Sequence, residues 1–266
     1  MFPVAFHGAP LSVSRDVRAG DQDWHIPTEV PVAFVYNRRN YAVMMATPDD
    51  LLDFALGFSL TEEVVKSPSD IHALDIHQTD KGVDLRFKID ANALERLDIV
   101  QRRRNMVGSA SCGLCGLENA DALFVTLPKV ADMPVELATE MMEKALADLG
   151  RHQPLNQKTR SVHAAAWVNH TGEVLIARED VGRHNAVDKL LGALAQTQTD
   201  MESGFLLVSS RCSYEIVEKA ARRGVQAILS VSGPTDFALQ KAKQAHMAIY
   251  SRQIKKGGDE SAVRLA

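Results

Sequence analysis

Two closely spaced cysteines form the part of the sequence best suited to chemistry. Cys112 and Cys115 lie in the segment SASCGLCG, residues 109–116, and each is followed directly by a glycine. Glycine lets the backbone turn sharply and approach a partner closely, so we expect an exposed loop. Arginines occupy positions 102–104, and a thiol near fixed positive charge is more often the reactive thiolate. The segment therefore predicts reactive thiols rather than inert, buried ones.

Three kinds of chemistry fit the spacing of these cysteines. A redox pair is the commonest use in a cytosolic protein, but such a pair normally opens a helix, and Gly113 and Leu114 make a poor helix start. Half a zinc site would need two further ligands, and Cys212 and the histidines have no paired spacing. In the third, sulfur carriage, one thiol holds a persulfide and the other assists. The spacing alone leaves all three open.

A second candidate site is the segment 178–189, REDVGRHNAVDK, which follows a predicted strand and enters a predicted helix. A helix start offers free N–H groups to an anion. Many polar groups leaving a buried strand cost free energy unless they bind something, or unless they satisfy one another in a salt-bridge cluster. His184 and Asp188, four residues apart, could pair on one helical face.

Three further segments have weaker signals. Ser209–Arg211 and Ser232–Thr235 are predicted strand-to-helix turns rich in hydroxyls, which can cradle phosphate or simply cap helices. Tyr250–Lys255 combines an aromatic ring with Arg and Lys after a predicted strand. Such a combination suits a base and its phosphates, although a solvated basic tail is the structural alternative.

Composition limits the class of protein. The chain has 266 residues, 45% of them hydrophobic, and a net charge of −4, so we expect a globular protein that does not bind nucleic acid over its whole surface. Three cysteines are too few for a disulfide framework. No apolar run approaches the ~18 residues of a membrane span. We expect a cytoplasmic protein without membrane association.

The first part of the chain is predicted to form a small α+β domain over residues 1–105. Residues 1–28 have no clear period, and we expect an irregular arm or one edge strand. A helix is predicted from Thr47, with Thr47 as its cap and Pro48 in its first turn. The other predicted elements are strands at 32–36, 41–46, 71–77 and 83–89, and a helix at 91–103.

The cysteine loop and a linker occupy residues 106–133, and the remainder, 134–266, alternates strand and helix. Strands are predicted at 162–168, 173–177, 204–209, 225–232 and 247–250, and helices at 134–149, 185–195, 214–223 and 235–246. We expect the tail after Lys255 to be mobile. This order predicts an α/β domain whose parallel or mixed sheet is flanked by helices, with ligands beyond the carboxyl ends of the strands.

Several of these segments resemble one known family, the formate dehydrogenase accessory sulfurtransferases (FdhD/NarQ). The similar segments are 48–65, including LDFALGFSLTEE; the cysteine loop 111–116; REDVGRHNAVDK at 178–189; and the turns 209–215 and 230–235. The resemblance spans most of the chain, and the segment 178–189 is its most specific part.

The resemblance implies a sulfurtransferase with a C-terminal domain similar to the cytidine deaminase fold, acting as a homodimer. Cys112 would accept sulfur as a persulfide from a cysteine desulfurase, with Cys115 as its helper. The sulfur would pass to the molybdenum bis(molybdopterin guanine dinucleotide) cofactor, which then enters the formate dehydrogenase catalytic subunit. Two alternatives remain from other classes: a thiol-disulfide oxidoreductase, and a non-catalytic chaperone for the cofactor.

We expect two sets of residues to hold that cofactor, and no permanently bound metal. The first is the end of the last predicted strand: Tyr250, Ser251, Arg252, Gln253, Ile254 and Lys255. The second consists of side chains from the segment 178–189: Arg178, Arg183, His184, Asn185 and Lys189.

The sequence departs from the family pattern at three places. The family often shows Thr-Gly-Gly-x-His, whereas this chain has Thr-Arg-Ser-Val-His at 159–163. Gln253 stands where a glycine is expected, and Cys212 stands where a non-cysteine residue is common, so Cys212 is left out of the mechanism. A deaminase zinc site would need His-x-Glu, and Ala186 occupies the glutamate position.

Overall fold

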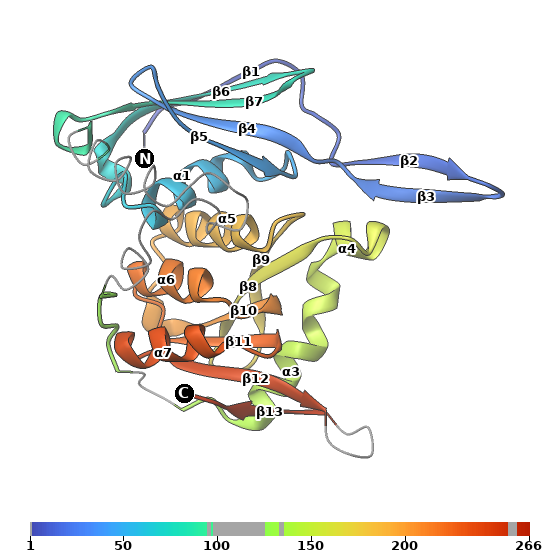
Figure 1. Ribbon diagram of the computed structural model, residues 1–266, viewed down its shortest axis with the longest axis vertical. Coiled ribbons are helices and arrows are strands. Elements are labelled where there is room, and N and C mark those ends of the chain that lie inside the picture. The colour runs from blue at the N-terminus through green and yellow to red at the C-terminus, as the bar shows by residue number, and fades with distance from the viewer. Residues whose placement is uncertain (1, 95–96, 98–125, 133–135, 255–259) are drawn as a thin grey trace.

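The computed structural model describes residues 2–94, 97, 126–132, 136–254 and 260–266. It contains two large sheets with helices between them, and a two-stranded arm that projects from the body (Figure 1). The predicted reactive loop, with Cys112 and Cys115, lies outside the described residues.

The N-terminal unit is a five-stranded sheet in the order β1-β6-β7-β4-β5. The strands predicted at 32–36, 41–46, 71–77 and 83–89 are confirmed: β4 pairs antiparallel with β5 and β6 with β7, and β4 runs parallel to β7 at the centre. Alternate residues of these strands point to one face, where aromatic rings such as Phe34 and Phe58 stack with a centroid distance of 3.9 Å. The strands are β1 (Val4–His7), β4 (Val30–Tyr36), β5 (Arg39–Ala46), β6 (Ile71–Thr79) and β7 (Gly82–Ile89).

Helix α1 (Leu51–Thr61) covers that face, but it does not begin where we predicted. Thr47 is not its cap; Asp50 occupies the cap position in the left-handed region, with φ of 50° and no capping side-chain bond. Thr47 is instead bonded to β9 (Val174–Asp180), since its N–H donates to Asp180 at 2.9 Å and its hydroxyl accepts from Val181 at 3.2 Å. A capping rule considers only residues close in sequence, so it cannot predict that Thr47 bonds to residues more than a hundred positions away.

The first 28 residues are more ordered than predicted. Val4–His7 forms an edge strand of the five-stranded sheet, pairing parallel with β6. Strands β2 (Ser14–Ala19) and β3 (Gln22–Pro27) form a separate antiparallel hairpin, which is the projecting arm in Figure 1. The expectation of an irregular arm or a single strand was therefore wrong for residues 14–27.

The C-terminal unit is a mixed six-stranded sheet in the order β13-β12-β11-β10-β8-β9. Strands β10, β11 and β12 run parallel, and β8 and β13 are antiparallel to their neighbours. The mixed sheet with flanking helices confirms the predicted α/β class, and its likeness to the deaminase fold stays a prediction. Its further strands are β8 (His163–Asn169), β10 (Gly204–Arg211), β11 (Ala227–Ser232), β12 (Ala248–Ile254) and β13 (Glu260–Arg264).

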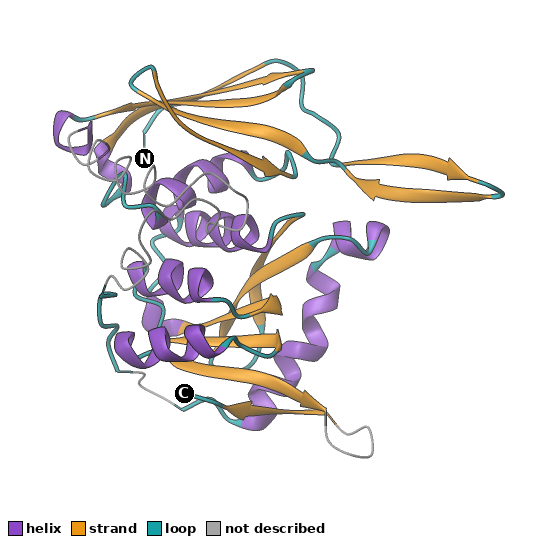
Figure 2. Ribbon diagram, in the orientation of Figure 1, coloured by secondary structure: helices purple, strands orange, loops and turns teal. Residues whose placement is uncertain are grey.

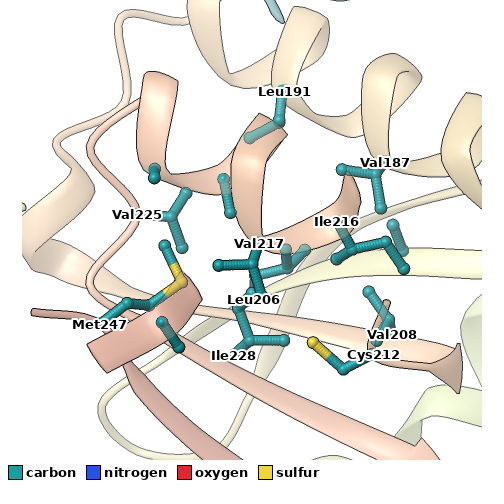
Figure 3. Close-up of a cluster of buried hydrophobic side chains, with 14 of the residues drawn as sticks. Val187, Leu191, Leu206, Val208, Cys212, Ile216, Val217, Val225, Ile228 and Met247 are labelled. Carbon is teal, nitrogen blue, oxygen red and sulfur yellow. The ribbon is translucent and has the colours of Figure 1, made fainter. Parts of the chain in front are cut away.

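Helices cover both faces of this sheet (Figure 2). Leu206 and Val208 of β10 face one hydrophobic cluster, and Phe205 and Leu207 face another, as the two-residue period of a strand requires. The first cluster, drawn in Figure 3, packs under α5 (Arg183–Gln196), α6 (Tyr214–Arg222) and α7 (Asp236–Ala245), and the second under α3 (Thr139–Leu149). Four short helices complete the elements of the described residues: α4 (Pro154–Thr159), η1 (Pro68–Asp70), η3 (Gly150–His152) and η4 (Met201–Ser203).

Two sequence predictions fail in this unit. Helix α3 begins at Thr139 rather than at Pro134, and residues 136–138 are not helical. The tail after Lys255 is not wholly mobile, because Glu260–Arg264 forms β13, which pairs with β12. That pairing depends on a partner strand, which the polar composition of the tail does not reveal.

Helices α1 and α5 join the two units in backbone contact. A Cβ atom on Gly57 would lie 1.7 Å from the carbonyl oxygen of Asp188, and one on Gly192 would lie 1.9 Å from that of Asp53. Both glycines are therefore required by the close approach of the two helices, which lie between the sheets in Figure 1. No helix in the described part of the chain has both the length and the apolar character needed to span a membrane.

Candidate functional site

The candidate site is the edge of the six-stranded sheet at which its parallel strands end. There β9, β10, β11 and β12 finish, β8 begins, and α5 and α6 start directly after β9 and β10 (Figure 1). Such an edge is where ligands of open α/β sheets bind. We call it the carboxyl edge.

Two helix starts at the carboxyl edge lack a side-chain cap within the described part of the chain. Gly182 caps α5 and Ser213 caps α6, and neither makes a side-chain capping hydrogen bond. The hydroxyl of Ser213 is used elsewhere, at 3.2 Å from His184 Nε2. Uncapped helix starts attract anions, because the first N–H groups and the helix dipole both favour negative charge.

Polar side chains connect these two helix starts. Nε2 of His184, in the first turn of α5, lies 2.8 Å from Oε2 of Glu215 in the first turn of α6. Both side chains are mostly buried, with 15% and 17% of their area exposed. We call His163, Arg183, His184, Ser213 and Glu215 the edge cluster.

His163 brings a second imidazole to the edge cluster. It is the first residue of β8 and pairs in register with Asp180 at the end of β9. Burial lowers the pKa of His163, and the electrostatic effect of the neighbouring Arg183 and His184 lowers it further. Its ring is therefore neutral near pH 7 and can donate one hydrogen bond and accept another.

Arg183 has an unused donor. Its Nε is buried, and among the described residues no hydrogen-bond acceptor is available to it. A buried charged donor without an acceptor is costly, so such groups in native structures require an explanation. A phosphate oxygen at the start of α5 would satisfy this donor and the free N–H groups together.

The predicted strand-end segment reaches the carboxyl edge only in part. Tyr250 is 1% exposed and packs in the cluster under α3, with its ring 6.0 Å from the guanidinium of Arg264. Ser251 is also buried, and its hydroxyl donates to the Arg252 carbonyl at 3.3 Å. Arg252 is half-buried and Gln253 is exposed. Ile254 is the last residue of β12, and Lys255 lies outside the described residues.

Lys189 and Asn185 have bonding partners inside the protein instead. The Lys189 ammonium lies 2.8 Å from Asp180 Oδ2 and donates to the carbonyls of Thr47 and Glu179. The Asn185 amide donates to Asp180 at 2.9 Å and to the Met45 carbonyl at 2.8 Å. Both were expected to contact the cofactor, but they are buried and engaged, so we assign them a structural role.

Arg178 is likewise committed to the junction between the units. Its Nε lies 2.6 Å from Asp53 and 3.4 Å from Asp50, both near the start of α1. Burial raises the pKa of Asp50, although the nearby guanidinium opposes that shift. This geometry is the salt-bridge cluster that the sequence left open as an alternative for part of the segment 178–189.

His184 and Asp188 do not form the pair that their spacing allowed on one helical face. Asp188 is turned toward α1 and α6, where its carboxylate accepts from Thr61 at 2.6 Å and lies 2.9 Å from the Lys219 ammonium. Side chains of the neighbouring helix α6 pair with both residues instead, Glu215 with His184 and Lys219 with Asp188.

Cys212 is not a candidate for sulfur chemistry. It lies in the core between β10 and α6, beside Val208 and Ile216 (Figure 3), with none of its area exposed. Burial raises the pKa of its thiol to about 12, so the reactive thiolate is scarce at neutral pH. Leaving Cys212 out of the mechanism agrees with this position.

Sequence reasoning missed three members of the edge cluster as site residues: His163, Ser213 and Glu215. His163 begins the antiparallel strand whose partner ends in the segment 178–189, so recognition of that hairpin could have placed it there. Ser213 and Glu215 follow a predicted strand end, which is a comparable signal. Within the described ranges, no group of three or more His, Cys, Asp or Glu residues could hold a metal ion.

Comparison with known proteins gives consistent matches over most of the chain. The model of the FdhD/NarQ family matches residues 27–256. A protein of Xanthomonas euvesicatoria named sulfur carrier protein FdhD is 42% identical over 247 residues, 90% of this chain and 86% of its own. A protein of the same name from Cupriavidus necator is 44% identical over 224 residues, 84% of this chain and 77% of its own.

A solved structure has the same fold. It is the crystal structure of a protein from Desulfotalea psychrophila described as a formate dehydrogenase accessory protein. The two chains superimpose with a TM-score of 0.68, covering 95% of this chain and 96% of the other, at 22% sequence identity.

Proposed function

The chain belongs to the FdhD/NarQ family, and from this we propose that it is a sulfur carrier protein that supplies sulfur for formate dehydrogenase. Relatives that are 42% and 44% identical over most of the chain have that name. The observation in this structure that supports the proposal is the edge cluster. Two helix starts without side-chain caps lie there beside Arg183, whose Nε has no hydrogen-bond partner among the described residues, and these features suit recognition of a phosphorylated substrate.

We propose that Cys112 carries the sulfur and that Cys115 assists it. The Cys112 thiolate attacks the outer sulfur of a persulfide on a cysteine desulfurase, and the donor cysteine leaves as a thiolate. Cys112 then holds a persulfide, whose terminal sulfur can be passed on. Glycines after both cysteines support a loop that can reach a donor and an acceptor in turn.

The sulfur acceptor that we propose is the molybdenum bis(molybdopterin guanine dinucleotide) cofactor, bound as a substrate before it enters formate dehydrogenase. Arg183 and the starts of α5 and α6 would hold its phosphates, with His184 held in place by Glu215. Arg252 and Gln253, at the end of β12, are on the same edge of the sheet and would contact the nucleotide. We also propose that the protein acts as a homodimer.

The test of this function compares two cysteine variants in activation of formate dehydrogenase. Cys112→Ala should abolish activation while leaving the circular dichroism spectrum unchanged, whereas Cys212→Ala should retain activation. Full activation by Cys112→Ser would instead favour a chaperone that binds the cofactor without chemistry. Reduction of a disulfide substrate, together with a failure to bind GDP, would favour an oxidoreductase.

A further inference from the structure

The projecting arm is a hairpin that lacks a core of its own. Every residue from Arg15 to His25 is exposed, including 57% of Trp24 and 37% of Val17. Val17 and Trp24 are paired in register, so the two apolar side chains lie together on one face of the arm. A two-stranded hairpin is only marginally stable in water, and an exposed tryptophan on such an arm is typical of a contact surface.

The two strands of the arm differ in their surroundings. α4 packs against β3, and the long side chain of its Lys158 also reaches the base of β2, with Nζ 3.1 Å from the Ser14 hydroxyl and 3.9 Å from Oδ1 of Asp16. β2 is on the other side of the arm, and its outer edge is directed away from α4 (Figure 1). β2 is therefore the edge open to another strand.

The hydrogen-bond pattern of the hairpin shows which backbone groups of β2 point outward. Thr28 donates to the Val13 carbonyl at 2.9 Å, so Val13 is bonded to the β3 side. Bonding alternates along an antiparallel strand, and Arg15 and Val17 therefore also face β3. The N–H and C=O groups of Asp16 and Arg18 point outward and can pair with a new strand.

From this pattern we infer that β2 pairs antiparallel with β2 of a second copy of this chain, with Val17 at the two-fold axis. Asp16 then lies opposite Arg18 of the partner subunit, and the two exchange backbone hydrogen bonds. The symmetry repeats this pair on the other side of Val17. The backbone pattern allows other registers only if one strand is shifted by two residues relative to the other. Those registers would place two Asp16 or two Arg18 side chains opposite each other at the axis, where like charges repel.

Side chains on both faces of the resulting four-stranded sheet fit this register. On one face, Trp24 and Val17 of each copy would form a continuous apolar row. On the other face, Asp16 lies 2.5 Å from His25 and 3.9 Å from the Lys158 ammonium of α4, and Arg18 lies 3.5 Å from Asp23 within each arm. Across the axis, Asp16 would lie next to the partner's Arg18, so each Asp16 carboxylate would gain a cationic neighbour in addition to Lys158. The charges thus complement a second copy of the same arm.

This inference builds on the proposed homodimer and names its surface; it does not depend on sulfur transfer. The first test is cysteine cross-linking. Residues at a position without backbone bonds in an antiparallel pair have Cα atoms about 4.5 Å apart, which suits a disulfide. Under mild oxidation, Val17→Cys should form a dimer linked through position 17, identified by peptide mass spectrometry. Val43→Cys, exposed on β5, is the matched control and should not.

The second test uses complementary charge reversals, measured by native mass spectrometry and sedimentation. Asp16→Arg and Arg18→Asp should each weaken self-association by about tenfold or more, because each places like charges in both symmetric pairs. An equimolar mixture of the two variants should form a 1:1 heterodimer. In the Asp16→Arg variant positions 16 and 18 are both positive, in the Arg18→Asp variant both are negative, and the two sets lie opposite each other.

The possible failures can be told apart. A dimer that is unaffected by either charge reversal, or a Val17→Cys cross-link no stronger than that of Val43→Cys, would overturn this surface while leaving the homodimer intact. A wild-type chain that remains monomeric would overturn both. Neither result would bear on sulfur loading of Cys112, which is measured separately.

Discussion

Lys189 and Asp180 form an ion pair with no exposed area on either side chain, the ammonium Nζ lying 2.8 Å from Oδ2. The pair connects the middle of α5 to the end of β9. Thr47 completes it, since its N–H donates to Asp180 and its carbonyl accepts from Lys189. The most specific segment of the family resemblance thus holds the two units together, and it presents only a few side chains at the carboxyl edge.

Removing one partner of this buried pair should strongly destabilise the protein. We expect Lys189→Met to lower the free energy of unfolding by about 3–5 kcal/mol, because Asp180 would remain buried without its counter-charge. Urea unfolding followed by circular dichroism measures the change. Lys88→Met, at an exposed position on β7, is the matched control and should change stability by less than about 0.5 kcal/mol. Equal stability of the two variants would contradict the structural role of Lys189.

The close contact between α1 and α5 should not tolerate a methyl group. We expect Gly57→Ala to destabilise the protein by about 1–3 kcal/mol or more, because the added Cβ would overlap the Asp188 backbone. Gly150→Ala is the control, since a Cβ at Gly150 meets no atom within 4 Å. Thermal unfolding of both variants checks this. Indistinguishable melting temperatures would show that the helices do not pack as described.

The lowered pKa of His163 makes stability depend on pH. The unfolded chain binds a proton at this residue near the ordinary value of 6.5, whereas burial and neighbouring positive charge oppose protonation in the folded state. The unfolded state therefore holds more protons below pH 6.5, and the folded state loses stability as the pH falls through that value. We expect His163→Asn to flatten this dependence, which urea unfolding at a series of pH values between 5 and 8 would measure. Parallel curves for the variant and the wild type would rule out this contribution.

Arg183 should contribute to nucleotide affinity through its Nε, which no acceptor from the described residues satisfies. We expect Arg183→Gln to weaken GDP binding by about tenfold or more, because a charge-assisted hydrogen bond to phosphate is lost. Isothermal titration calorimetry measures the dissociation constant. Arg86→Gln, on the other sheet and half exposed, should bind GDP like the wild type. The assignment fails if both variants keep wild-type affinity.

Local sequence patterns were sufficient for much of the fold. The hairpin of β4 and β5 is signalled by alternating apolar residues around a polar turn, and α7 by Thr235, whose hydroxyl accepts from the Ala238 N–H at 3.2 Å. Thr47 has the same local signal as Thr235, yet it bonds to Asp180, a residue 133 positions away. Caps are thus predictable where the helix start is exposed to solvent, and unpredictable where another unit packs on it.

The candidate site was predictable only in outline, for a similar reason. The rule that ligands bind at the carboxyl ends of parallel strands predicts the edge where the edge cluster lies, and ligand binding at that edge stays a prediction. The same polar composition, however, describes both Arg183 and Lys189. The Arg183 Nε has no acceptor in the described part of the chain, whereas Lys189 has three internal partners. Those partners come from residues distant in the sequence, so the separation of ligand-facing from structural side chains needed the three-dimensional arrangement.

The most direct measurement of the central proposal is sulfur loading by a cysteine desulfurase. The protein would be incubated with the desulfurase and cysteine labelled with radioactive sulfur, and its peptides then mapped by mass spectrometry without reductant. We predict one additional sulfur atom on Cys112, lost in Cys112→Ala and retained in Cys212→Ala, whose thiol is buried in the wild type. Loading of Cys212 instead, or no loading in the presence of an active donor, would contradict the proposal.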